Sequence, residues 1–378
     1  MKRRDFIKTN LAALGGALLA GGLPASTQAA EPSKSRRVPG KPEIKLGMRV
    51  SPGLSEQNLE FMRQLELGWC RLDVYSSDFG YEALARTRDH YEKHGLRIFT
   101  VINYARLTPA LLLGGPGRET QLQAFARSIG DLGRLGIPVC DMSWIGLLPG
   151  SQVFNTSTAD MNGIQTRIFD TAEYANIDKV VGRRWSAEEV RDALKYFLDR
   201  ILPVAEASGV RIAIHPDDPP IAEQGGVARI LHTFEQFRQL FDLCSSPSLG
   251  VNFCVGTWTE AGEAAGKPVI DAIRWFAAHS RLIDVHFRNI RGVLPRFQET
   301  FIDNGDQDMQ AVMNTLVEVG FNGLLVPDHV PAFAIDEVPA PLAGAYRTPF
   351  PPAGIAYSAA CMRTMLRNAC RRAGNPSR

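Results

Sequence analysis

Residues 211–220 read Arg-Ile-Ala-Ile-His-Pro-Asp-Asp-Pro-Pro, a short apolar run that ends in a histidine and a proline-stiffened acidic turn. We interpret Arg211–His215 as a buried strand. Before it, the capping sequence Trp185-Ser186-Ala187-Glu188-Glu189 opens a helical stretch that continues to Ser208. Another amphipathic stretch follows near residues 233–243. A strand between two helices is typical of proteins with a parallel β-sheet.

The same alternation extends in both directions from this strand. We predict strands at 44–50, 70–74, 97–103, 139–144, 211–215, 249–254, 283–288 and 324–327. We predict helices at 55–67, 81–94, 119–135, 185–208, 233–243, 269–278, 308–319 and 357–371. This order predicts an α/β fold, a (β/α)₈ TIM barrel in a single domain. A doubly wound open sheet is the alternative, but the glycines of 114–117 do not follow an early strand directly, as that fold requires. The segments 146–184 and 330–353 show no clear period and are interpreted as long loops, either lids or subunit contacts.

The first thirty residues differ from the rest of the chain. Paired arginines (Arg3-Arg4) precede Phe6 and Lys8, an uncharged stretch covers residues 11–23, and small residues offer a cleavage point near Ala29 or Ala30. This pattern resembles a twin-arginine (Tat) export signal, which the export machinery reads as an address. We therefore expect a signal peptide at 1–30, a linker at 31–44, a barrel catalytic domain at 45–378, and a periplasmic or exported protein. The apolar stretch is shorter than the about 20 residues of a membrane span, so no stable membrane anchor is expected.

Composition narrows the function classes. Hydrophobic residues make up 45% and charged residues 22% of the chain, as in ordinary globular proteins. The formal net charge is +2 and no basic stripe is apparent, so nucleic acid is not an expected partner. The six cysteines are scattered without a disulfide framework and are interpreted mostly as buried thiols. A homo-oligomer is compatible with the sequence but not specified by it.

Four consecutive predicted strands end in metal-binding residue types. In a TIM barrel the active site lies at the carboxyl ends of the strands. The residues found there are His215, Cys254, His286 and Asp328. Imidazole, thiolate and carboxylate ligands suit a borderline-soft divalent ion, Mn²⁺, Fe²⁺, Co²⁺ or Zn²⁺, and a catalytic ion keeps one position open for substrate or water. We therefore expect one metal ion at the mouth of the barrel.

Neighbouring residues add candidates for catalysis and substrate binding. Arg288 and Asn289 follow His286 and could bind a substrate carboxylate, although Arg288 could equally form a salt bridge at the barrel rim. His329 follows Asp328 and could act as a general acid or base, or support a ligand through a hydrogen bond. Asp217 and Asp218 could form a turn or orient His215.

These motifs resemble the mannonate dehydratase family, which has a xylose-isomerase-like barrel. The similarity covers most of residues 45–375. It rests on His215-Pro-Asp-Asp-Pro-Pro220, Asn252-Phe-Cys254, His286-Phe-Arg-Asn-Ile290, Gly305-Asp-Gln-Asp-Met309, Gly320-Phe-Asn-Gly323 and Pro327-Asp-His329, and more weakly on Gly47-Met48-Arg49 and Phe169-Asp170. The resemblance implies a divalent ion, most readily Mn²⁺ or Fe²⁺, on the four residues named above. It also implies acid–base roles for His329 and for Tyr357, within Ala356-Tyr357-Ser358-Ala359. Arg49 joins Arg288 and Asn289 as a candidate substrate-binding residue.

The family dehydrates D-mannonate to 2-keto-3-deoxy-D-gluconate, so the resemblance implies a lyase with a small sugar-acid substrate. The chain departs from the family pattern after the fourth strand, where it reads Asp141-Met-Ser-Trp-Ile-Gly146, and after Glu299, where the family's histidine is lacking. Two alternatives stay open. One is a metal-dependent sugar isomerase or epimerase, whose usual ligands are Glu, Asp and His rather than Cys. The other is a noncatalytic, exported sugar-acid-binding homologue.

Overall fold

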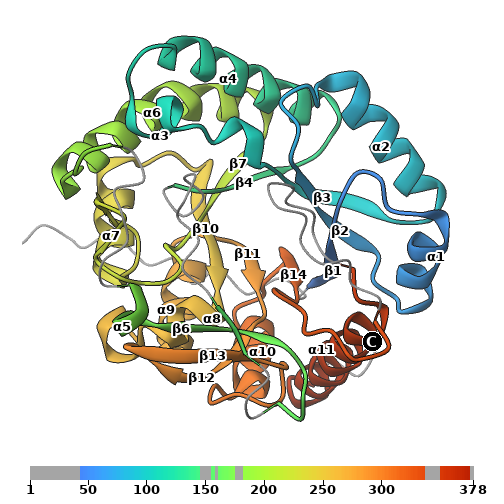
Figure 1. Ribbon diagram of the computed structural model, residues 1–378. Helices are drawn as coiled ribbons and strands as arrows, with labels where there is room; N and C mark the ends of the chain where they lie inside the picture. The colour runs from blue at the N-terminus through green and yellow to red at the C-terminus, as the bar shows by residue number, and fades with distance from the viewer. Residues whose placement is uncertain (1–42, 145–154, 158–160, 175–181, 337–349, 375–378) are drawn as a thin grey trace, which may run out of the picture. The chain divides into compact units, whose positions relative to one another are not determined.

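The computed structural model describes residues 43–144, 155–157, 161–174, 182–336 and 350–374, all within the unit Pro39–Arg378. Eight parallel strands close into a barrel, which confirms the predicted α/β barrel fold (Figure 1). In order around the barrel the strands are β1 (Lys45–Val50), β2 (Trp69–Val74), β3 (Arg97–Asn103), β4 (Val139–Ser143), β7 (Arg211–His215), β10 (Leu249–Cys254), β11 (Leu282–His286) and β14 (Leu324–Val326). The predicted signal peptide, and the linker up to residue 42, lie outside the described residues.

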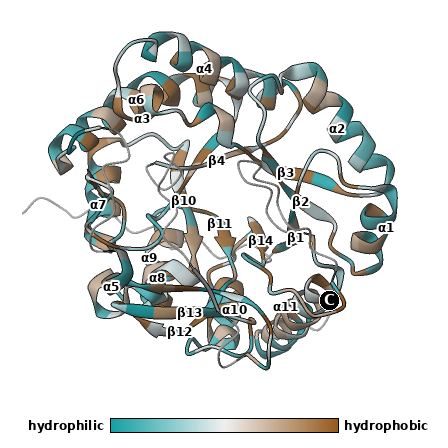
Figure 2. Cartoon of the chain, viewed as in Figure 1, coloured by the Kyte–Doolittle hydropathy of each residue, from teal (hydrophilic) through white to brown (hydrophobic). Residues whose placement is uncertain are grey.

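Helices surround the barrel and turn their apolar sides toward it (Figure 2). The main ones are α1 (Glu56–Gln64), α2 (Tyr81–Lys93), α4 (Arg118–Arg134), α6 (Ala187–Ser208), α7 (Phe234–Leu243), α9 (Val269–Ala278), α10 (Met309–Glu318) and α11 (Pro352–Arg372). Shorter ones are α3 (Pro109–Leu113), α5 (Thr171–Tyr174), α8 (Val255–Glu260) and the 3₁₀ turns η1 (Tyr104–Arg106) and η2 (Gly262–Ala265). None of the helices in the described ranges is long and apolar enough to span a bilayer.

Helix α6 shows how local sequence sets an element. Ser186 and Glu189 form a capping box: the Ser186 hydroxyl accepts a hydrogen bond from the Glu189 amide at 3.2 Å, and the Glu189 carboxylate accepts one from the Ser186 amide at 2.9 Å. The helix ends at Gly209, whose φ of 67° lies in the left-handed region that glycine adopts readily. The predicted start and end of this helix are therefore within two residues of the observed ones.

Two predictions about the elements were wrong. The segment 146–184 was expected to be a loop, but its described part contains β5 (Asn155–Ser157), β6 (Thr166–Asp170) and α5. Strand β11 ends at His286 rather than at residue 288, and β12 (Asn289–Val293) begins a hairpin with β13 (Arg296–Thr300). The hairpin pairs with β6, giving a four-stranded antiparallel sheet in the order β12-β13-β6-β5. One buried apolar side chain from each of three strands, Phe169, Ile290 and Phe297, packs into a small core of this sheet.

The last helix begins earlier than predicted. It starts at Pro352 instead of residue 357, and Pro is favoured in the first turn because its missing amide hydrogen is not needed there. The carboxylate of Asp336 accepts hydrogen bonds from the amides of Ala353 at 2.7 Å and Gly354 at 3.2 Å. The cap is thus supplied by a residue distant in sequence, and no local motif marks it.

Candidate metal centre and active site

His215, Cys254, His286 and Asp328 meet at the carboxyl ends of four adjacent barrel strands. One ligand atom from each lies within 4.8 Å of the others, and all but His215 are fully buried. The strand register accounts for this, because Cys254 of β10 pairs with His286 of β11, which in turn pairs with Val326, two residues before Asp328. The structure thus brings together the four residues that the strand ends predicted.

Hydrogen bonds hold both histidine rings of the cluster. Nδ1 of His215 donates to the carbonyl oxygen of Pro216 at 2.6 Å, which leaves the lone pair of Nε2 available. Nε2 of His286 lies 2.7 Å from Nη1 of Arg71 and 2.9 Å from Nδ2 of Asn252. Its Nδ1 is buried without a hydrogen-bond partner among the described residues and lies 3.6 Å from Oδ2 of Asp328. Burial lowers the pKa of both rings, so both are neutral near pH 7, as ligands must be.

Cys254 and Asp328 supply the two anionic donors. Cys254 is the N-cap of α8, and its Sγ accepts a hydrogen bond from the Thr257 amide at 3.5 Å. Burial raises the pKa of the thiol to about 11, partly opposed by the nearby charge of Arg288, so a bound cation would be needed to make it a thiolate at neutral pH. Burial also disfavours the charged form of Asp328, but His329, His286 and Arg49 outweigh it and hold the pKa of this carboxyl well below its usual range.

Arg288 binds carboxylates of the protein itself. Its Nη2 donates to Glu260 at 2.7 Å and Asp218 at 2.9 Å, and its Nη1 donates to Glu299 at 2.9 Å and lies 3.3 Å from Asp328. The side chain is only 1% exposed. Arg288 therefore forms salt bridges at the barrel rim, the alternative to its expected role in binding a substrate carboxylate. A buried guanidinium surrounded by these acceptors has no exposed N–H group for a substrate.

Asn289 and Arg49 are likewise committed to protein partners. The buried amide of Asn289 donates to the carbonyls of Ile302 at 2.9 Å and Gln307 at 3.0 Å, and its oxygen accepts from the amides of Ile290 and Gln307. It fixes the chain around the β12–β13 hairpin and has no donor left for a substrate, which corrects its predicted role. Arg49 donates to Asp328 at 2.5 Å and to Asp73 at 2.9 Å, so its main task is to hold a candidate ligand, although 14% of its side chain remains exposed.

His329 lies at the edge of the cluster with an unusual backbone. Its φ of 45° is in the left-handed region, which few residues other than glycine adopt and which is found at functional sites. Its Nδ1 is 2.8 Å from Oε1 of Glu299, and Nη1 of Arg167 lies against the ring, 2.6 Å from Nδ1 and 2.8 Å from Nε2. Burial, reinforced by the charge of Arg167, lowers the pKa of His329, so the ring is neutral near pH 7.

Tyr357 lies on the first turn and a half of α11, where its hydroxyl donates to Asp303 at 2.6 Å. Its ring packs 4.8 Å from that of Phe301 and 6.0 Å from that of Phe333, centroid to centroid. The hydrogen bond to Asp303, together with partial burial, raises the pKa of the phenol, so it keeps its proton at neutral pH. Among the described residues, Tyr357 thus contacts Asp303 and two aromatic rings rather than the four clustered residues.

Sequence reasoning missed the polar residues beneath the cluster. They point into the barrel from its strands and are buried: Arg71, Asp73, Thr100, Asp141, Asn252 and Asp284. A signal was available, because side chains alternate along a strand and Asn252 and Asp284 each precede a candidate ligand by two residues. Arg167 was missed for another reason: β6 itself was not predicted.

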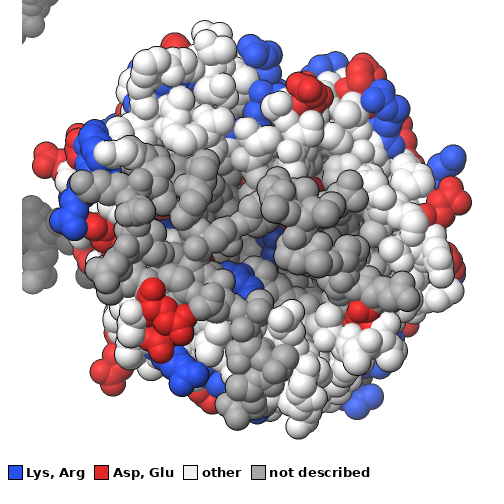
Figure 3. Space-filling model, in the orientation of Figure 1, with Lys and Arg blue, Asp and Glu red and all other residues white. Residues whose placement is uncertain are grey.

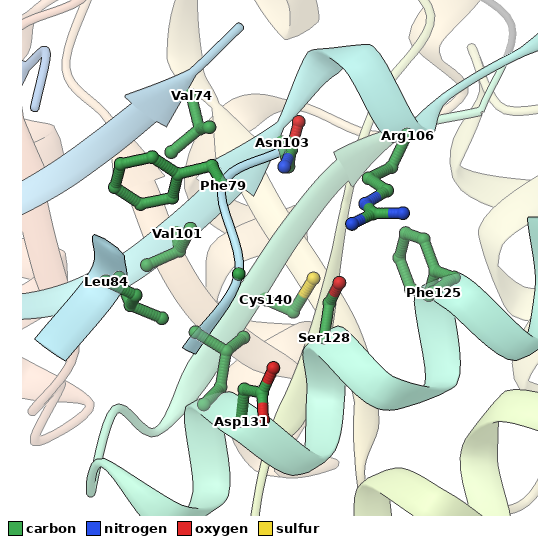
Figure 4. Close-up of a pocket in the computed structure, with 12 residues that line it drawn as sticks. Val74, Phe79, Leu84, Val101, Asn103, Arg106, Phe125, Ser128, Asp131 and Cys140 are labelled. Atoms are coloured by element: carbon green, nitrogen blue, oxygen red, sulfur yellow. The ribbon is translucent and has the colours of Figure 1, made fainter. Parts of the chain in front are cut away.

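The hollow at the centre of the barrel face contains positively charged side chains (Figure 3). A separate small cavity of about 40 Å³ lies between β2, β3, β4 and the helices α2 and α4, with Cys140, Val101 and Phe125 among its lining residues (Figure 4). It holds little more than one water molecule and none of the four clustered residues lines it, so it is not the substrate site.

Comparison with known proteins identifies the family. Residues 73–349 match the family model described as D-mannonate dehydratase (UxuA). The chain is 29% identical over 286 residues to the mannonate dehydratase of Streptococcus equi subsp. zooepidemicus, covering 68% of this chain and 76% of that protein. It is 30% identical over 273 residues to mannonate dehydratase 2 of Halalkalibacterium halodurans, covering 66% of this chain and 78% of that protein. The crystal structure of mannonate dehydratase from Streptococcus suis serotype 2 superposes with a TM-score of 0.76 at 25% identity, covering 89% of this chain and 96% of that one. The chain belongs to the D-mannonate dehydratase family, a family of hydro-lyases.

Proposed function

We propose that this protein removes water from D-mannonate to give 2-keto-3-deoxy-D-gluconate, with one divalent ion held by His215, Cys254, His286 and Asp328. The observation that carries the proposal is the convergence of these four side chains within 4.8 Å at the mouth of a barrel of this family.

The donors fit a resident ion. His286 Nδ1 is a buried nitrogen without a hydrogen-bond partner in the described part of the chain, and His215 keeps an open lone pair on Nε2. A thiol and a carboxylate complete a set that suits Mn²⁺ or Fe²⁺, and also Co²⁺ or Zn²⁺. When bound, the ion supplies positive charge next to the substrate carboxylate, which makes the proton on C2 easier to remove.

His329 and Tyr357 divide the proton transfers in this proposal. A neutral His329 that donates from Nδ1 to Glu299 has its basic lone pair on Nε2, where Nη1 of Arg167 lies 2.8 Å away. We assign Nε2 as the base that takes the proton from C2 once the substrate displaces this contact. Tyr357 carries its proton on a hydroxyl that donates to Asp303, so we assign it as the acid that protonates the departing C3 hydroxyl.

We assign recognition of the substrate carboxylate to Arg167. Its Nη1 lies 3.4 Å from Glu299 and against His329, but its side chain is 28% exposed, compared with 1% for Arg288 and 14% for Arg49. A guanidinium there can bind a carboxylate through two parallel hydrogen bonds.

Arg167→Met is expected to raise KM by about tenfold to 100-fold, because the loss of a charged hydrogen bond costs about 1.5–3 kcal/mol of binding free energy. Arg167→Lys should retain part of the affinity. The exposed Arg296 on the neighbouring strand serves as control, and an unchanged KM in Arg167→Met would refute the assignment.

We also propose export. The arginine pair, the short uncharged stretch and the small residues before position 30 support a twin-arginine signal, and hence a periplasmic or exported enzyme. Replacing Arg3 and Arg4 by lysine in the full chain should retain the protein inside the cell, as fractionation would detect. Equal export of this variant and the wild type would rule the signal out.

The activity is tested with protein lacking residues 1–30, reconstituted with Mn²⁺ and offered a panel of aldonates and uronates. We expect 2-keto-3-deoxy product from D-mannonate, lost in Cys254→Ser and kept in Cys361→Ser, a half-buried cysteine of α11. Full metal loading without turnover of any substrate would contradict the proposed dehydratase activity and favour the noncatalytic sugar-acid-binding protein. Interconversion of a keto and an aldo sugar without loss of water would favour an isomerase or epimerase instead. The similarity to mannonate dehydratases does not favour that alternative.

A further inference from the structure

A second group of metal-binding side chains lies on the outer ring of helices and shares no residue with the strand-end cluster. His90 and His94 stand on α2 and its C-cap, and Glu56 is the first residue of α1 (Figure 1). One ligand atom from each lies within 4.8 Å of the others. We propose that these three residues form a second metal site, which binds one Zn²⁺ ion, or another divalent ion that prefers imidazole, between α1 and α2.

The helix geometry favours chelation. His90 and His94 are four residues apart, so they lie one helical turn apart on the same side of α2. Their ring centroids are 5.4 Å apart at an interplanar angle of 72°. Two imidazoles spaced in this way on one helix can bind a single ion, and a carboxylate from a neighbouring helix adds a third ligand. Water fills the fourth position of a tetrahedral Zn²⁺ site.

The three side chains are not committed to other polar partners. Within the described residues none of them forms a side-chain hydrogen bond or ion pair, in contrast to the residues of the strand-end cluster. The histidines are half-buried and Glu56 is exposed, so the ligands are partly ordered by packing yet reachable from solvent. His90 also packs against Tyr91, with ring centroids 6.2 Å apart, which limits its rotamers. An ion bound here would link the first two β/α units of the barrel.

Equilibrium dialysis of the untagged protein against ZnCl₂, followed by metal analysis, tests the site. We expect two ions per chain in the wild type and one in His90→Gln and in His94→Gln. His279→Gln, which changes an exposed histidine at the end of α9, should still bind two. A melting curve for each variant checks that it is folded, and activity with Mn²⁺ should be unchanged in His90→Gln and His94→Gln.

The test separates this site from the strand-end cluster. Cys254→Ser weakens only the cluster, so combining it with His94→Gln should remove an ion that Cys254→Ser alone retains. If His90→Gln and His94→Gln bind as much Zn²⁺ as the wild type, the second site does not exist. The same conclusion follows if the wild type binds a single Zn²⁺ ion that is lost in Cys254→Ser but kept in His90→Gln and His94→Gln.

Discussion

Arg288 links the segments that follow the candidate ligands in the chain. Its guanidinium contacts carboxylates of four segments, each following a different barrel strand: Asp218, Glu260, Glu299 and Asp328. Burial alone would lower the pKa of Arg288, but the surrounding anions outweigh it and raise the pKa well above the usual value, so the charge is permanent. Removing one partner of such a buried network is costly because the other charges lose their compensation.

Gly256 makes room for this arginine. A Cβ built at Gly256 would lie 2.2 Å from Nε of Arg288, a contact that real structures do not show. We expect Gly256→Ala to displace the guanidinium, to destabilise the fold by about 1–3 kcal/mol and to lower kcat/KM by about 100-fold. Urea denaturation and steady-state kinetics measure the two effects. Gly53→Ala is the matched control, because nothing lies within 4 Å of its added Cβ. Wild-type kinetics in Gly256→Ala would show that Arg288 does not position the site.

For single residues, the sequence predicts which side chains can bind a metal better than it predicts which hydrogen bonds a side chain forms. His215, Cys254 and His286 are recognisable because each ends a strand and carries a metal-binding atom. The tasks of Arg288 and Asn289 depend on Glu260, Glu299 and the carbonyl of Ile302, which come from other segments. No spacing rule within the chain brings these groups together.

The antiparallel sheet β12-β13-β6-β5 positions Arg167 and Glu299 beside His329. The eight barrel strands could be predicted because each is a short apolar run flanked by an amphipathic helix. Strand β6 pairs with the short strand β5 (Asn155 with Ile168) and with β13, about 130 residues later in the chain (Phe169 with Phe297). The place of β6 in the sheet depends on β13, a distant segment, so the residues of 146–184 alone do not predict it.

Phe169 anchors β6 to the hairpin. It is fully buried, and its ring centroid lies 5.3 Å from that of Phe297. We expect Phe169→Ala to loosen β6, to speed amide hydrogen exchange in β6 and β13, and to raise KM because Arg167 is no longer held. Metal content should stay unchanged, because the four candidate ligands lie on other strands. Val293→Ala, at a half-exposed side chain of the same sheet, is the control. Unchanged exchange and KM would show that the sheet does not position the site.

We expect an ion bound at the strand ends to stabilise the whole barrel. Without an ion the buried cluster leaves Nδ1 of His286 unpartnered and Cys254 as a neutral thiol, both of which an ion would satisfy. A ligand that binds only the folded state stabilises it by about 2.7 kcal/mol at a concentration 100 times its Kd.

We therefore expect chelator-treated protein to melt at least several degrees below protein reloaded with Mn²⁺, as calorimetry would measure. Cys254→Ser should lose most of this difference, whereas Cys361→Ser should keep it. Equal melting temperatures with and without the ion would indicate that the cluster contributes nothing to folding.

The most direct test of the strand-end metal site is the absorption spectrum of the protein loaded with one equivalent of Co²⁺. A cobalt ion bound to a thiolate gives a charge-transfer band in the near ultraviolet, and Cys254 is the only cysteine in the cluster. Metal binding by Cys254 predicts this band in the wild type and in Cys361→Ser, and its disappearance in Cys254→Ser. A wild-type protein that binds Co²⁺ without the band, or a band that survives Cys254→Ser, would contradict it.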